Sequence, residues 1–208
     1  MAIAYIDTSQ APMVDLRFKT AAFMCFFTLI LGIIGVPIGI VVALQKSAAL
    51  NFIINTPLKI VSFVFSIYIF LQLKRLLVER HHLYSMSNLI NYIIIIYIYS
   101  NVVSFFLSIF QVIVQDPNAG VLFSLILLIP AILLGAIISF IFGFRLLEAK
   151  DLASGLYRTY AILYIIGGVC FFTIILFPIG ILSAMVSDVV LGIIFLEESK
   201  TEAQVEFV

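Results

Sequence analysis

The sequence predicts an all-α, polytopic bundle of six transmembrane helices in a single membrane domain, residues 1–208, with the N-terminus in the cytoplasm. Of its 208 residues, 64% are hydrophobic and only 11% are charged, and the mean hydropathy is +1.27. Soluble domains carry about 25% charged residues, so these few charges could not cover the surface of a soluble core. A bilayer accepts such a chain, provided that its backbone forms helices that satisfy their own hydrogen bonds.

The apolar runs predict the number of crossings. Four runs are about 22–26 residues long, and about 20 residues span the hydrocarbon layer. A fifth, at about 158–196, is too long for one crossing, because as a single helix it would extend about 60 Å. It contains Pro178 and Gly180 near its middle, and Pro with Gly signals a turn. One kinked helix there, giving five crossings, is the alternative. We predict helices at about 20–44, 52–73, 89–114, 120–144, 158–177 and 180–196, followed by an acidic C-terminal tail, 197–208.

The loop charges predict the orientation. Lys and Arg accumulate in cytoplasmic loops. The loops of the other side hold only Lys46, which places the N-terminus in the cytoplasm, and six crossings return the C-terminus there. Small polytopic chains of this kind are typical of bacteria, so we expect a multi-pass protein of the bacterial inner (plasma) membrane. The eight basic residues of the side expected in the cytoplasm are Arg17, Lys19, Lys74, Arg75, Arg80, Arg145, Lys150 and Arg158.

A row of small residues on the fourth run predicts a helix-packing face. Ala131, Gly135, Ser139 and Gly143 recur at intervals of four, so they share one side of a helix. In lipid, small faces and polar contacts decide how helices associate. The face fits a helix of the same chain or of another one. We therefore expect as partners the lipid bilayer and either other membrane protein subunits or a second copy.

Polar residues form stripes within the predicted membrane helices. The last run carries Asp188 between Ala184 and Gly192. A charge at the bilayer centre costs roughly 2.5–3.5 kcal/mol. We predict that Lys59 and Asp188 form an ion pair, or share a polar cleft open to the outer face. The alternative is that the polar groups only join helices by hydrogen bonds, while Lys59 reaches up to the interface. The predicted intramembrane polar cluster comprises Asn55, Lys59, Ser62, Asn101, Ser104, Ser108, Gln111 and Asp188, with Ser66 and Tyr97 on the same stripes.

No motif predicts a catalytic, cofactor or metal site. His81 and His82 are adjacent, and adjacent side chains do not converge on one ion, so we expect a solvated basic loop. The sequence contains no HExxH, GxSxG, Walker A or Rossmann pattern. Its net charge of zero leaves no basic face for nucleic acid. Cys25 and Cys170 lie in apolar runs, where core packing is their expected role.

The segment from Cys25 to Leu31 resembles the segment from Cys170 to Leu176. Internal repeats occur in transporters, but chance similarity among Ile, Phe and Leu remains the alternative.

The sequence favours a non-catalytic role, as a subunit or assembly scaffold of a larger membrane complex. The alternative is a small solute or ion transporter, or a channel, that uses an intramembrane region around Lys59 and Asp188. A third possibility, a membrane enzyme or redox carrier, requires bound haem or quinone.

Overall fold

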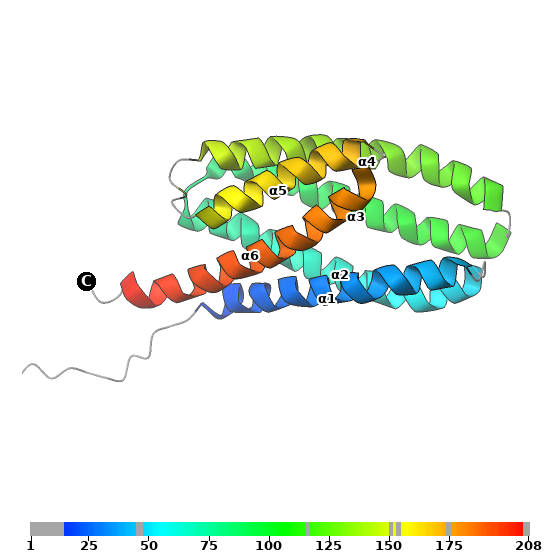
Figure 1. The fold of residues 1–208 in the computed structure, drawn as a ribbon, viewed down its shortest axis with the longest axis horizontal. Helices are drawn as coiled ribbons and strands as arrows, with labels where there is room; N and C mark the ends of the chain where they lie inside the picture. Colours follow the sequence, from blue (N-terminus) through cyan, green and yellow to red (C-terminus); the bar gives the residue numbers. More distant parts are fainter. Residues whose placement is uncertain are drawn as a thin grey trace, which may run out of the picture.

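The computed structural model describes residues 15–44, 48–114, 117–149, 152, 155–173 and 176–205. These residues form six long α-helices and one short π-helical segment, and they contain no strand. The predicted all-α, six-helix class is thus confirmed. Six helices are long and apolar enough to cross a membrane, so the fold is that of a multi-pass membrane protein (Figure 1). The elements are α1 (Leu16–Leu44), α2 (Ala48–Arg75), η1 (Leu76–Arg80), α3 (Tyr84–Val114), α4 (Pro117–Glu148), α5 (Gly155–Phe172) and α6 (Phe177–Val205).

The fifth apolar run is divided into two helices, so the five-crossing alternative is wrong. Helix α5 ends at Phe172, and α6 begins at Phe177. Pro178 lies in the first turn of α6, where its missing N–H removes no helical hydrogen bond. The two helices then turn back on each other as a hairpin (Figure 1). The break also interrupts the segment that begins at Cys170, whereas the similar segment at Cys25 lies wholly within α1. The two similar segments therefore have different structures.

Most helices extend beyond the apolar runs that predict them. Helix α2 starts at Ala48 rather than near residue 52, and α3 starts at Tyr84 rather than near residue 89. Helix α6 continues to Val205, through much of the segment predicted as an acidic tail. The physical reason is that hydropathy marks only the part of a helix in hydrocarbon. Beyond it, a helix continues as long as its polar side chains are solvated.

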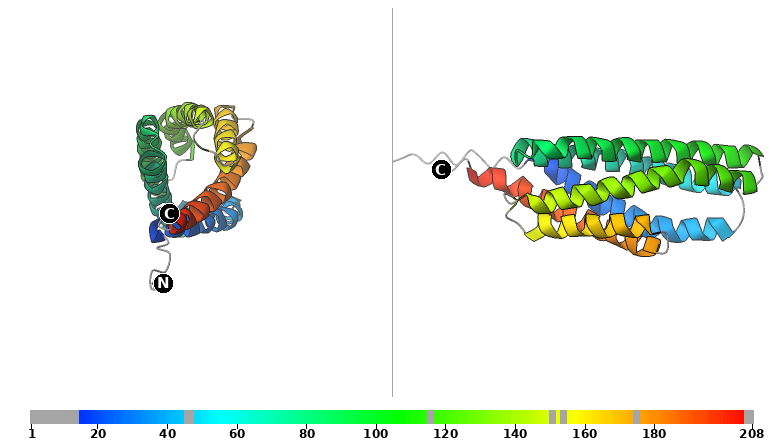
Figure 2. Two further views of the ribbon diagram at one scale, coloured as in Figure 1. Left: turned by 90° about the vertical axis from the view of Figure 1, so that its left-hand side faces the viewer. Right: turned by 90° about the horizontal axis from the view of Figure 1, so that it is seen from above.

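The six helices form a closed ring. Each helix packs against its neighbours in sequence, and α6 returns to pack against α1. Among the described residues, no two of these α-helices approach each other across the ring. Seen from one end of the bundle, the helices are arranged in a ring (Figure 2, left). This order places α2 and α3 opposite α5 and α6.

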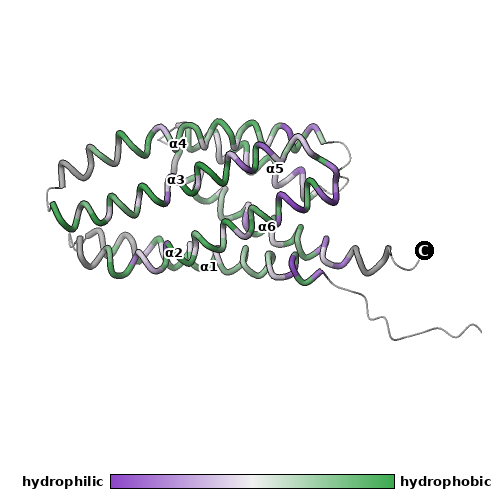
Figure 3. The backbone as a smooth tube through the Cα atoms, turned by 180° about the vertical axis from the view of Figure 1, so that it is seen from behind, coloured by the Kyte–Doolittle hydropathy of each residue, from purple (hydrophilic) through white to green (hydrophobic). Residues whose placement is uncertain are grey.

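The packed core lies toward one end of the ring, which we call the charged end. It is the end where α1 begins and α6 finishes (Figure 1), and hydrophilic residues gather there (Figure 3). Fully buried residues of this core include Ala21 of α1, Leu73 of α2, Tyr160 of α5 and Phe195 of α6. Tight packing therefore closes the ring at the charged end.

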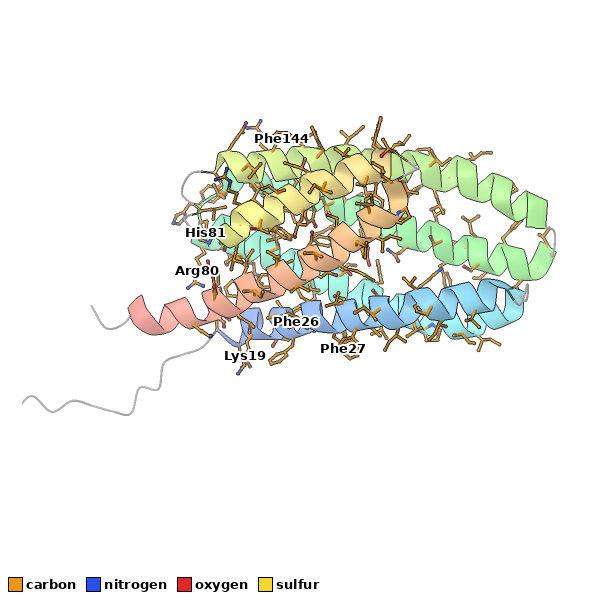
Figure 4. All side chains as sticks on the ribbon, viewed as in Figure 1. Lys19, Phe26, Phe27, Arg80, His81 and Phe144 are labelled. Carbon is orange, nitrogen blue, oxygen red and sulfur yellow. The ribbon has the colours of Figure 1, made fainter. Side chains whose placement is uncertain are left out.

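The opposite end is built from fewer helices. Helix α5 has 18 residues and α4 has 32, which correspond to about 27 Å and about 48 Å. As a result, α1 to α4 project past the α5–α6 hairpin (Figure 1). Around the bundle, large apolar side chains such as Phe27 and Phe144 point outward (Figure 4) and are exposed, as a lipid-facing surface requires.

Candidate functional site

A cavity of about 520 Å³ lies inside the helix ring. Five of the six helices, α2 to α6, contribute side chains to it. Its apolar wall includes the rings of Phe70 and Phe171. A cavity of this volume is within the range of small-molecule sites, about 300–1,000 Å³. The polar residues that line it are Ser66, Tyr97, Ser100, Ser139, Tyr164, Ser187 and Asp188.

Asp188 lies near the middle of the membrane-spanning part of α6. It precedes Glu198 by ten residues, a rise of about 15 Å along the helix. The hydrocarbon layer is about 30 Å thick. With Glu198 at the headgroup level of the charged end, the carboxyl group of Asp188 is therefore close to mid-depth.

The side chain of Asp188 is within hydrogen-bonding range of the Thr28 hydroxyl of α1. That hydroxyl has a single proton and lies 2.8 Å from the carbonyl oxygen of Cys25, so it donates either to that oxygen or to Asp188. Within the described part of the chain, no Lys, Arg or His forms an ion pair with Asp188. The carboxyl group thus faces the cavity with a hydroxyl partner and no resident cation.

The structure does not bring Lys59 to Asp188. Helix α2 packs against α1 and α3, not against α6. The side chain of Lys59 is exposed and does not line the cavity. It lies seven residues further from the charged end than Ser66, about 10 Å along the helix. The predicted ion pair and shared cleft are therefore absent from the described structure, because the ring places the face of α2 that carries Lys59 away from α6.

Part of the two predicted stripes does meet, at Tyr97. Its hydroxyl is in hydrogen-bonding range of Ser62 and Ser66 on α2 and of Asn101 on α3. Its ring stacks on Phe63, with centroids 5.8 Å apart. The α2–α3 contact is thus polar at the centre and aromatic around it, and it holds Tyr97 at the cavity wall.

The other stripe residues whose side chains are described do not line the cavity. Ser108 donates to the carbonyl oxygen of Ser104 at 2.8 Å, within its own helix. Asn55 lies on α2, nearer the opposite end than the cavity. Gln111 belongs to α3, but its side chain is outside the described part of the chain. Among the members of the predicted intramembrane polar cluster whose side chains are described, only Asp188 therefore lines the cavity.

The small-residue face of α4 is used within the chain. Ala131, Gly135 and Ser139 line the cavity. Gly143 lies directly against α5, because a Cβ atom there would be 2.6 Å from Cγ1 of Ile165 and 2.7 Å from the carbonyl oxygen of Ala161. The face that could have fitted either kind of partner thus packs on α5 and borders the cavity.

A second polar group, which we call the charged-end cluster, comprises Arg80, His81, Tyr157 and Glu198. Arg80 and His81 lie at the charged end (Figure 4). Nη1 of Arg80 is 3.2 Å from Oε2 of Glu198 and donates to its backbone oxygen at 2.7 Å. Tyr157 donates to Oε1 of Glu198 at 2.8 Å. Since that uses the only hydroxyl proton of Tyr157, Nε2–H of His81 donates to the Tyr157 oxygen, 3.0 Å away.

The charged-end cluster was not predicted from the sequence, which placed His81 in a solvated loop. In the structure His81 is half-buried, and the cluster joins η1 to α5 and α6 across the ring. A basic residue and a carboxylate 118 positions apart give no local signal of contact. Likewise, no local feature of the sequence marks Thr28 or Tyr164 as a neighbour of Asp188.

The chemistry available in the cavity is neutralisation of one positive charge and hydrogen bonding to hydroxyl groups. In the described ranges, no three His, Cys, Asp or Glu side chains come together as metal ligands. No protein-family model matches this sequence, and comparisons with curated proteins and with solved structures find no match.

Proposed function

We propose that this protein binds a small solute in the cavity inside its helix ring and moves it through the membrane. The observation that supports the proposal is a cavity of about 520 Å³, lined by five helices, that contains the carboxyl group of Asp188 near mid-depth. A buried ionisable group inside a membrane is costly and is usually part of a substrate or ion pathway.

The packing suggests the side from which the solute enters. Between the cavity and the charged end lie fully buried side chains, including Leu73, Tyr160 and Phe195. On the other side, the α5–α6 hairpin ends and only α1 to α4 continue (Figure 1). We infer that this conformation is closed toward the charged end and admits solute from the opposite end.

The charged end is, in this proposal, cytoplasmic, and the membrane is a bacterial inner membrane. Two single cysteines in a Cys25→Ala/Cys170→Ala background test the orientation: His82→Cys at the charged end and Asn118→Cys at the start of α4. A membrane-impermeant maleimide applied to intact cells is expected to label the cysteine at 118 and to label that at 82 only after lysis. The reverse labelling pattern would show that the charged end faces the outside of the cell.

Cysteine accessibility also tests the cavity as a solute path. In the same background, Ser139→Cys faces the cavity, whereas Ile137→Cys, on the same helix at similar depth, faces lipid. A small cationic methanethiosulfonate in water is expected to modify the cysteine at 139 at least tenfold faster than that at 137. Combining Gly135→Leu with Ser139→Cys should slow the modification of the cysteine at 139, because the leucine side chain fills the cavity. Equal, slow modification at both positions would refute a water-accessible path.

A role as a subunit or assembly scaffold of a larger membrane complex, or as a self-associating protein, is the second candidate. The observation in its favour is that α1 to α4 project past the α5–α6 hairpin (Figure 1), so that within the described ranges neither α5 nor α6 covers their projecting parts. The small-residue face of α4 does not add support, because Gly143 packs on α5 and the other three residues of the face line the cavity. Extraction in native nanodiscs followed by mass spectrometry distinguishes the candidates: a stoichiometric membrane partner favours the subunit role, and a monomer disfavours it.

A further inference from the structure

We infer that the solute bound in the cavity is a monovalent organic cation, with an ammonium-type head group that pairs with Asp188 and an apolar or aromatic body. This inference rests on the proposed function and specifies its substrate class. It follows from three features of the cavity: its charge, the number of its anionic ligands and the nature of its wall.

The charge of the cavity is set by Asp188. Helix α6 packs against α1 and α5. The titratable side chains of α1 and α5 that lie close enough to interact electrostatically with Asp188 are Cys25, Tyr160 and Tyr164. Tyr97 of α3 does so as well. None of these is basic. A carboxyl group at this depth, without a cation from the chain, is neutralised either by a proton or by a positive charge that arrives with the ligand. A cationic ligand supplies that charge to the ionised form.

The number of ligands disfavours a divalent metal ion. Ca²⁺ takes six to eight oxygen ligands, and Mg²⁺ requires near-octahedral geometry. The cavity offers a single carboxyl group and scattered hydroxyls, and within the described ranges no set of three His, Cys, Asp or Glu side chains forms. One carboxylate matches one positive charge.

The wall of the cavity fits an organic body. Four aromatic rings line it, contributed by Phe70, Tyr97, Tyr164 and Phe171. Aromatic faces attract cations, and they also pack against apolar groups. An anion is repelled by Asp188, and a neutral ligand leaves the carboxylate unpaired, so the same residue selects against both.

Binding of three matched probes to the full protein in phospholipid nanodiscs tests this inference. The probes are phenethylammonium, neutral 3-phenylpropan-1-ol and anionic 3-phenylpropionate, with empty nanodiscs as the blank. We expect the wild-type protein to bind the ammonium probe at least tenfold more tightly than either of the others. Equal or tighter binding of the neutral or anionic probe overturns the inference, and this comparison needs no variant.

Three variants assign the preference to Asp188. Asp188→Asn is expected to abolish it, whereas Glu148→Gln is the matched control, since it removes a carboxylate that is exposed at the charged end. Asp188→Glu, which keeps the charge, is expected to retain the preference and serves if Asp188→Asn does not fold. Retained preference in folded Asp188→Asn overturns the assignment.

The outcomes separate this inference from the proposed function. Phenethylammonium is expected to slow modification of the Ser139→Cys variant. If the cysteine at 139 is modified rapidly from water but the ammonium probe neither binds nor protects it, the substrate class is wrong and the solute path stands. If the cysteine at 139 reacts no faster than that at 137, the proposed function itself fails.

Discussion

Replacing Gly143 by alanine is expected to lower the free energy of unfolding by about 1–3 kcal/mol, the usual cost of overpacking a close contact. The added methyl group would stand 2.6 Å from Cγ1 of Ile165 and 2.7 Å from the carbonyl oxygen of Ala161. The Ile165 side chain can move, but the carbonyl belongs to the backbone of α5. The two helices must therefore separate, and in lipid close packing is a main force that holds helices together.

Gly135→Ala is the matched control on the same helix. A Cβ atom at Gly135 would meet only Cγ2 of Ile96, at the ordinary contact distance of 3.5 Å. Because alanine favours helix over glycine by up to about 1 kcal/mol, this variant is expected to be neutral or slightly stabilising. The measurement is unfolding by SDS in mixed micelles, followed by circular dichroism. If Gly143→Ala is no less stable than Gly135→Ala, the close α4–α5 contact is not as described.

Combining Gly143→Ala with Ile165→Ala refines this test. The double variant relieves the clash with the Ile165 side chain but leaves the clash with the Ala161 carbonyl. We therefore expect partial recovery relative to Gly143→Ala, after the effect of Ile165→Ala alone is subtracted. Full recovery would show that the backbones of α4 and α5 are further apart at this point.

Replacing Glu198 by alanine is expected to cost about 1–3 kcal/mol of stability, because it leaves half-buried hydrogen-bonding groups without a partner. The carboxylate of Glu198 accepts from Tyr157 and pairs with Arg80, and its Oε1 lies 3.3 Å from Nε2 of His81. Without the carboxylate, the hydroxyl of Tyr157 loses its acceptor, and the guanidinium of Arg80 keeps only its hydrogen bond to the backbone oxygen of residue 198. The connection between η1 and α6 is therefore weakened. The cation–π contact between Arg80 and Phe18 of α1, 5.9 Å from guanidinium to ring centre, is expected to weaken as well.

Two further substitutions separate charge from hydrogen bonding in the charged-end cluster. Glu198→Gln keeps an acceptor for Tyr157 and removes the charge, so its loss should be smaller than that of Glu198→Ala. Glu148→Ala removes the exposed partner of Arg145 and should cost less than about 1 kcal/mol, as surface ion pairs do. The same SDS titration measures all three. An equal effect of Glu198→Ala and Glu148→Ala would contradict a structural role for the cluster.

The helices could be predicted from local features of the chain. Runs of apolar residues locate the crossings, and Pro178 with Gly180 locates the break between the last two helices. The helix ends at Tyr84 and Val205 could not be placed in the same way. Those turns lie outside the hydrocarbon, where hydropathy no longer distinguishes a helix from a loop.

The candidate site could be predicted only in part. Asp188 is conspicuous in the sequence because a charged residue is rare within an apolar run. The environment of Asp188 could not be predicted, because Thr28, Tyr97 and Tyr164 come from three other helices. Lys59 is equally conspicuous, yet the exposed face on which it lies is determined by the neighbours of α2 in the ring.

The hydropathy of the chain predicts a helical membrane protein and favours six crossings, and the residue pattern marks Asp188 and the small-residue face of α4 as features that need an explanation. The ring closed by α6 and α1, the packing of Gly143 on α5 and the position of Asp188 at a cavity, away from Lys59, follow from the arrangement of the helices in space. Crossing a membrane depends on the hydropathy of consecutive residues, whereas the partner of a polar group depends on which helices become neighbours.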